Sequence, residues 1–182
     1  MLKLRSLQKK KQEELQNNGS SSTKDRKLTP AQIRIEKDLK ELDLPPTIKL
    51  QKVNDKEFLI IITPDEGFYQ YGIFKFQILI NNNFPIDCPK VKCLNKIYHP
   101  NIDLDGNICL NILREDWSPV LNLNTILVGL LFLFLEPNAT DPLNKESANV
   151  LIRDKNLFKR YVLSSINGGS IDGVRYDYVL NR

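Results

Sequence analysis

The segment 72–80, with the sequence GIFKFQILI, has the alternating pattern of a half-buried β-strand. Read as a strand, it places four large apolar side chains on one face: Phe74, Phe76, Ile78 and Ile80. Moving outward along the chain, further strands are expected over 47–53, over 57–63 (EFLIIIT) and over 90–95. No helical segment separates these runs, so the sequence predicts a four-stranded antiparallel meander.

Helices are expected on both sides of the meander. Thr29 and Gln32 have the spacing of a capping box, and the prolines at 45–46 are expected to end the helix that follows. The segment 125–135 is apolar nearly all round and predicts a central buried helix. Its ten-residue apolar run is too short for a membrane span, which needs about 20 residues. Further helices are expected over 145–152 and 156–166, which gives an α+β fold with a long irregular loop over 97–120.

The net charge of +4 is concentrated in one part of the 182-residue chain. Residues 1–27 carry eight basic and three acidic residues, whereas residues 28–182 carry 18 basic and 19 acidic residues. The sequence therefore predicts a flexible basic extension over 1–27 and a nearly neutral folded domain over 28–182. A nucleic-acid-binding protein is a weaker reading, because the neutral domain has no recognition motif.

Three cysteines without a secretory signal indicate free thiols in a reducing compartment, the cytoplasm or the nucleus. Cys88 and Cys93 are read as packing residues. Cys109 follows a turn in the long loop, where a thiol is better placed to react. No metal site is expected, because the cysteines lack C-x-x-C spacing and the chain has one histidine.

The common hydrolytic thiol chemistries do not fit Cys109. Arg114 follows with four residues between, one fewer than a tyrosine-phosphatase loop needs, and His99 is better placed to tie its own loop by hydrogen bonds than to act as a base. A nucleophilic thiol without a dedicated base suits thioester exchange, where both attacking and leaving groups are thiolates.

The spacing of the loop motifs resembles that of the ubiquitin-conjugating enzyme family. His99-Pro100-Asn101 is followed by Cys109 eight residues after the asparagine, and Trp117-Ser118-Pro119 begins eight residues after the cysteine. The resemblance covers about residues 28–166 and includes three supporting features: Tyr98, the Phe84-Pro85 turn and Asp141-Pro142-Leu143.

The resemblance implies the ubiquitin-conjugating fold and a role for each matching residue. Cys109 would carry a ubiquitin-like modifier as a thioester, Asn101 would support the loop and stabilise the oxyanion, and Asp141 would orient the substrate lysine. His99, Pro100 and Trp117 would support the active site. No cofactor is implied for this chain, because ATP is used by the activating enzyme. A non-catalytic module of the same fold is disfavoured by Cys109 in its full motif.

The first residues of the chain resemble the extension found in the branch of the family that conjugates the Nedd/Rub modifier. The resemblance implies docking on a heterodimeric activating enzyme through Leu2, Leu4 and Leu7, with Met1 held by a co-ligase. A solubilising tail without a specific role is the plainer reading. A conjugating enzyme for ubiquitin itself remains the nearest alternative.

The same branch implies a monomer that modifies cullins with a RING-type ligase, with neither a membrane nor nucleic acid as a partner. The expected ligase contacts are Ser118, Pro119 and Val120. Two departures from the family pattern bear on this contact: Cys88 stands where many members have proline, and Cys93 where many have an aromatic residue.

Overall fold

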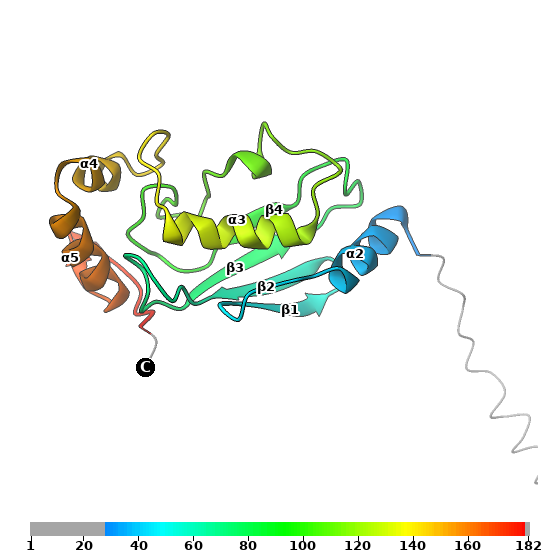
Figure 1. Cartoon of the computed structure of the whole chain (residues 1–182), viewed down its shortest axis with the longest axis horizontal. Coiled ribbons are helices and arrows are strands. Elements are labelled where there is room, and N and C mark those ends of the chain that lie inside the picture. Colours follow the sequence, from blue (N-terminus) through cyan, green and yellow to red (C-terminus); the bar gives the residue numbers. More distant parts are fainter. Residues whose placement is uncertain (1–27, 181–182) are drawn as a thin grey trace, which may run out of the picture.

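The structure, a computed structural model, describes residues 28–180 and consists of a twisted sheet with helices at its ends and over one face (Figure 1). The helices are α2 (Pro30–Lys40), α3 (Leu123–Leu135), α4 (Lys145–Arg153) and α5 (Lys155–Ile166), with a 3-10 turn, η1, at Asn111–Leu113. The strands are β1 (Ile48–Asn54), β2 (Glu57–Ile62), β3 (Phe74–Leu79), β4 (Lys90–Cys93), β5 (Ser170–Ile171) and β6 (Val174–Arg175).

The four-stranded antiparallel meander is confirmed. The strands lie in the order β1-β2-β3-β4, and every neighbouring pair is antiparallel. The alternation of β3 buries Phe74, Phe76 and Ile78 on the face expected from the sequence. In the β2–β3 register Ile60 lies opposite Phe76, so both strands contribute to the same core face.

Helix α3 lies over this face of the sheet (Figure 1). It begins at Leu123, two residues before the expected start, because the Asn122 side chain caps it by accepting from the Thr125 N–H. The expected central helix is confirmed and buries one face, whereas Phe132 on the other side is 54% exposed. Seven side chains form the buried face: Leu123, Ile126, Leu127, Leu130, Leu131, Leu133 and Phe134.

Helix α2 has the expected capping box, with the Gln32 N–H donating to Thr29 Oγ1 at 3.2 Å and the Thr29 N–H to Gln32 Oε1 at 2.8 Å. The expected end at residues 45–46 is wrong, because the helix stops at Lys40. Beyond it, the Asp43 N–H donates to the Asn124 side chain of α3 at 3.0 Å.

The chain after α5 contains a two-stranded hairpin, β5–β6, that the sequence pattern did not predict. Asp172 and Gly173 form its turn, both with positive φ. Tyr176 and Val179 beyond the hairpin are buried in the main core, so this segment belongs to the folded domain. The expected extension over 1–27 lies outside the described residues. No helix within 28–180 is long and apolar enough to cross a membrane.

Candidate active site

Cys109 lies in the loop that connects β4 to η1, close under the surface. Its backbone N–H donates to the Asn101 carbonyl at 2.8 Å, and a bridge between Ile102 and Ile108 joins the two arms of the loop. The residue as a whole is 7% exposed. All three cysteines are free thiols.

The structure brings Asp141 and Arg114 to the sulfur of Cys109. Cys109 Sγ lies 3.2 Å from Asp141 Oδ2, although the two residues are 32 positions apart in the sequence. Arg114 Nη2 donates to Sγ at 2.7 Å and to Asp141 Oδ2 at 3.1 Å. Asp141 was expected here from the sequence. Arg114 was not, although its place five residues after the cysteine, across the η1 turn, was the available signal.

The two neighbours act on the thiol in opposite directions. Burial raises the pKa of Cys109, and the hydrogen bond to Asp141 raises it further, whereas the positive charge of Arg114 lowers it. The hydrogen bonds from Cys109 and then from Arg114 hold the pKa of Asp141 below its ordinary value. In the unloaded protein at neutral pH, Cys109 is therefore a protonated thiol beside an ionised carboxylate.

His99 holds the loop from inside the core and is fully buried. Its Nε2 lies 2.9 Å from the Leu133 carbonyl of α3, and its Nδ1 accepts from the Asn101 N–H at 2.9 Å. These contacts fix a neutral ring with hydrogen on Nε2, and burial lowers the pKa of His99 to about 4. The hydrogen bonds are of the kind expected from the sequence, and Pro100 adds one by accepting from the Asn144 N–H at 3.0 Å.

Asn101 uses its side chain to hold a second loop. Its Nδ2 donates to the Asn138 carbonyl at 2.8 Å, and its Oδ1 accepts from the Asn138 N–H at 2.9 Å. Asn138 lies three residues before Asp141, so Asn101 connects the loop of the thiol to the loop of the carboxylate.

Trp117 packs beneath the loop rather than at the thiol. Its Nε1 donates to the Pro85 carbonyl at 3.0 Å, and its ring lies 6.1 Å from that of Phe84. This contact brings Ile86, which is 67% exposed, next to the Trp117 loop. The sequence analysis did not single out Ile86, and it read Cys93 as a packing residue at a position where many family members have an aromatic side chain. Cys93 is buried and hydrogen-bonds the Asn95 carbonyl, so its side chain cannot reach a partner.

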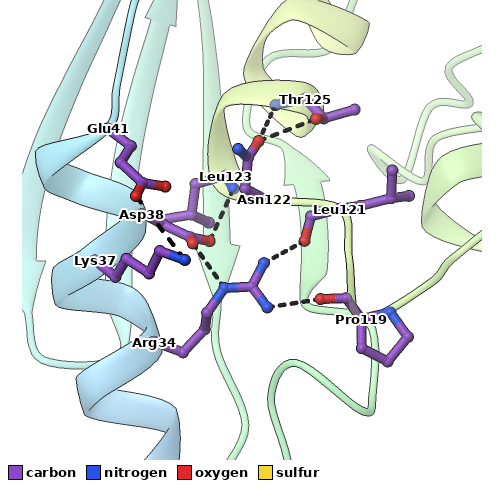
Figure 2. A network of polar contacts seen from close by, with 9 residues as sticks. All are labelled: Arg34, Lys37, Asp38, Glu41, Pro119, Leu121, Asn122, Leu123 and Thr125. Atoms are coloured by element: carbon purple, nitrogen blue, oxygen red, sulfur yellow. Dashed lines mark hydrogen bonds and ion pairs between the residues drawn. The ribbon is translucent and has the colours of Figure 1, made fainter.

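A network centred on Arg34 fixes the segment that follows Trp117 (Figure 2). Arg34 donates to the carbonyls of Pro119 and Leu121, each at 2.6 Å, and pairs with Asp38 at 2.7 Å. Asp38 is buried and also accepts from the Leu123 N–H at 3.1 Å, at the start of α3. Val120 is 85% exposed on the segment held in this way, Pro119 is exposed and Ser118 is half-buried.

Two further expectations concern the docking residues at the start of the chain and a metal site. Met1, Leu2, Leu4 and Leu7 lie outside the described residues. Residues 28–180 contain no group of three or more His, Cys, Asp or Glu side chains that could hold a metal ion.

The fold and the thiol site together define the class. The family model described as "Ubiquitin-conjugating enzyme" matches residues 34–166, and the chain belongs to that family. Within the family, the chain is 52% identical to the NEDD8-conjugating enzyme UBC12 of Yarrowia lipolytica, over 99% of both chains. It is 46% identical to the Nedd8-conjugating enzyme UbcE2M of Drosophila melanogaster, also over 99% of both.

Solved structures give the same assignment of fold. The structure of Saccharomyces cerevisiae Ubc12 superposes with a TM-score of 0.85 at 50% identity, covering 100% of this chain and 99% of that one. The E2 domain of a Toxoplasma gondii ubiquitin-conjugating enzyme superposes with a TM-score of 0.64 at 32% identity, covering 72% and 93%. The expected ubiquitin-conjugating fold is confirmed.

Proposed function

We propose that this chain accepts a NEDD8-type modifier from its activating enzyme as a thioester on Cys109 and transfers it to a lysine, with cullins as the substrates. The observation that supports this most is full-length similarity, near 50% identity, to enzymes named for NEDD8 conjugation, combined with a thiol held at 3.2 Å from Asp141. The proposed location is the cytoplasm or the nucleus, which fits three cysteines that are all free thiols.

The reaction has two acyl transfers. The Cys109 thiolate attacks the thioester carbonyl of the charged activating enzyme, forming a carbon–sulfur bond and releasing the activating enzyme's thiolate. A substrate lysine amine then attacks the new thioester, an amide bond forms, the Cys109 thiolate leaves and the amine loses a proton to solvent. ATP is consumed by the activating enzyme, and this chain needs no cofactor of its own.

Asp141 and Asn101 have separate parts in the second transfer. Once the thiol is acylated it has no hydrogen to donate, so Asp141 Oδ2 becomes available to accept from the lysine amine. Its low pKa makes Asp141 an orienting acceptor rather than a strong base. Asn101 keeps the two loops together and directs its second Nδ2 hydrogen to the oxyanion.

The direct test is Cys109→Ser with the NEDD8 activating enzyme, NEDD8 and ATP. The unaltered chain should form an adduct that excess thiol removes, and the variant at most an ester that resists thiol. Cys88→Ser is the matched control and should load normally. A thiol-sensitive adduct that survives Cys109→Ser would refute the assignment of the nucleophile.

The choice of modifier is tested separately. We expect loading by the NEDD8 activating enzyme at low enzyme concentration, with the ubiquitin activating enzyme far less effective. Loading by the ubiquitin-specific enzyme alone would establish the alternative, a conjugating enzyme for ubiquitin.

The extension over 1–27 is proposed as a docking peptide for the activating enzyme, with Leu2, Leu4 and Leu7 as anchors and Met1 held by a co-ligase. Its net positive charge, from eight basic against three acidic residues, would speed the encounter with an acidic groove. Deleting 1–27 should slow loading while the thermal unfolding temperature of the core stays unchanged. Equal loading rates with and without the extension would instead support a solubilising tail.

The exposed segment held by Arg34 is proposed as part of the contact with a RING-type ligase, through Ser118, Pro119 and Val120, with Ile86 beside them. Val120→Asp should abolish ligase-stimulated discharge while discharge to free lysine stays unchanged. Ile152→Asp is the matched control, an exposed apolar residue of α4 at the other end of the molecule (Figure 1). Ligase stimulation that survives Val120→Asp would place the contact elsewhere.

A further inference from the structure

Within residues 28–180, Arg114 is the one side chain in contact with the reacting sulfur that neither the sequence motif nor the proposed function uses. Its Nη2 lies 2.7 Å from Cys109 Sγ, closer than any other side-chain contact to that sulfur among the described residues. Because Arg114 and Cys109 flank the η1 turn, the backbone presents the guanidinium to the thiol. Two hydrogen bonds close the turn. The Leu113 N–H donates to the Leu110 carbonyl at 2.9 Å, and the Arg114 N–H donates to the Asn111 carbonyl at 2.9 Å.

Two side chains contact the sulfur, and they stabilise opposite protonation states of it. The contact with Asp141 uses the thiol hydrogen and so stabilises the neutral thiol. The contact with Arg114 places a permanent positive charge on the sulfur and so stabilises the thiolate. The chemistry of the family needs the thiolate twice, as nucleophile in loading and as leaving group in discharge.

We propose that Arg114 is a catalytic residue that stabilises the Cys109 thiolate in both acyl transfers. In loading, the thiol proton passes to solvent, the guanidinium faces the negative sulfur, and the charge disappears as the carbon–sulfur bond forms. In discharge, the carbon–sulfur bond breaks as the lysine amide forms, and the same guanidinium receives the departing thiolate.

Asp141 holds Arg114 in place between these steps. In the thioester the sulfur carries no charge, and the guanidinium keeps its hydrogen bond to Asp141 Oδ2 at 3.1 Å. Glu115 lies on the other side, with Oε2 at 3.8 Å from Arg114 Nε, and its negative charge raises the pKa of the thiol. Removing the charge of Arg114 and removing that of Glu115 should therefore shift the titration of Cys109 in opposite directions.

The experiment measures alkylation of Cys109 by iodoacetamide from pH 6 to 11, in the full chain, by mass spectrometry of the Cys109 peptide. This step needs no activating enzyme and no modifier, so it tests Arg114 even if the proposed function is wrong. Arg114→Gln should slow alkylation at pH 7 by about three- to tenfold. Loss of the positive charge raises the pKa of Cys109, and each unit of that rise lowers the reactive thiolate fraction tenfold. The limiting rate at high pH should be unchanged, and Glu115→Gln should speed alkylation at pH 7.

Two further variants separate a direct effect from an indirect one. In the Asp141→Asn background, Arg114→Gln should still slow alkylation at pH 7, since the guanidinium contacts the sulfur itself. If the effect disappears there, Arg114 acts only through Asp141 and the proposal is wrong. Arg160→Gln, an exposed arginine of α5, is the matched control and should leave the profile unchanged.

Arg114→Lys keeps the charge without the planar guanidinium and should give an intermediate profile. An apparent pKa of Cys109 that is the same in the unaltered chain, Arg114→Gln and Arg114→Lys would overturn the proposal. With the activating enzyme present, Arg114→Gln should also slow single-turnover discharge to free lysine. Loss of the thiol-sensitive adduct in Cys109→Ser together with an unchanged profile in Arg114→Gln would refute this inference and leave the proposed function standing.

Discussion

The side chain of Asn101 and the backbone of Asn138 form a reciprocal pair of hydrogen bonds, 2.8 Å from Nδ2 to the carbonyl and 2.9 Å from the N–H to Oδ1. One residue thereby satisfies both backbone groups of another across 37 positions of the chain. The pair joins the loop that carries Cys109 to the loop that carries Asp141. The geometry of the active site thus depends on a contact that involves neither reacting group.

Asn101→Ala should lower both stability and catalysis. Losing the pair leaves the Asn138 N–H and carbonyl without partners, which should cost about 2 kcal/mol of the free energy of unfolding. Discharge to free lysine should fall about 100-fold, since an oxyanion donor is removed as well. Urea denaturation and single-turnover discharge measure the two effects.

Asn101→Asp separates the two roles, because a carboxylate still accepts from the Asn138 N–H but has no hydrogen to donate. We expect this variant to recover part of the stability and none of the discharge rate. Recovery of discharge together with stability would assign Asn101 to loop support alone.

The Asp38 network predicts a large effect on folding. Asp38 is 2% exposed and pairs with Arg34 at 2.7 Å while accepting from the Leu123 N–H at 3.1 Å. Asp38→Ala leaves the guanidinium unpaired and a helix-terminal N–H unsatisfied, so the free energy of unfolding should fall by about 3 kcal/mol. Urea denaturation checks this value.

Lys37→Met is the matched control on the same helix. Lys37 faces Glu41 at 3.9 Å, and both side chains are exposed. Its loss should change the free energy of unfolding by less than about 0.5 kcal/mol. Similar losses for Asp38→Ala and Lys37→Met would show that the buried network contributes no more than a surface pair.

The sequence predicted the sheet and the helices because their signals are local. The alternation Phe74, Phe76, Ile78 and the capping box of Thr29 and Gln32 depend on neighbours a few positions away. Errors occurred where contacts with distant residues determine the path of the chain. After the end of α2, for example, the Asp43 N–H donates to the Asn124 side chain. The β5–β6 hairpin has two residues in each strand, which is too short for a periodic signal.

Some residues of the candidate site could be predicted from the sequence and others could not, for the same reason. The motif spacing located Cys109, Asn101 and Asp141, because these residues have fixed places in the family pattern. It did not indicate Arg114, whose contact with the sulfur depends on the η1 turn. The interpretation of Cys93 as a packing residue is confirmed, since it is buried, but the sequence did not single out the exposed Ile86. Contacts between distant segments, such as the bonds from Arg34 of α2 to the Pro119 and Leu121 carbonyls, leave no pattern in a single sequence.

Gly106 is expected to tolerate no side chain. It has φ +82°, and a Cβ atom there would lie 2.1 Å from the Cys93 carbonyl oxygen, which is backbone and cannot move aside. Gly106→Ala should therefore lower the free energy of unfolding by more than about 2 kcal/mol.

Gly173→Ala is the matched control in the β5–β6 turn. Gly173 has φ +80° with nothing within 4 Å of a Cβ, so only backbone strain applies, about 1 kcal/mol. Urea denaturation of both variants measures the difference. Equal losses would mean that the turn before Cys109 opens enough to accommodate a methyl group.

Because His99 is buried, the free energy of unfolding should depend on pH below neutrality. Its pKa is lowered from 6.5 to about 4 in the folded chain, because burial disfavours the charged ring. Below pH 6.5 the unfolded chain takes up a proton that the folded chain does not, so unfolding is favoured as the pH falls. The contribution of His99 is complete above pH 6.5 and is lost progressively down to pH 4, a change on the order of 3 kcal/mol.

Urea denaturation at pH 7, 6, 5 and 4.5 measures this slope, and His99→Gln provides the comparison. The variant is less stable at pH 7, since the bonds to the Leu133 carbonyl and the Asn101 N–H are weakened or lost. Its free energy of unfolding should nevertheless fall less steeply between pH 6.5 and 4.5, because no imidazole titrates. Parallel slopes in the two proteins would assign the acid sensitivity to carboxylates instead of His99.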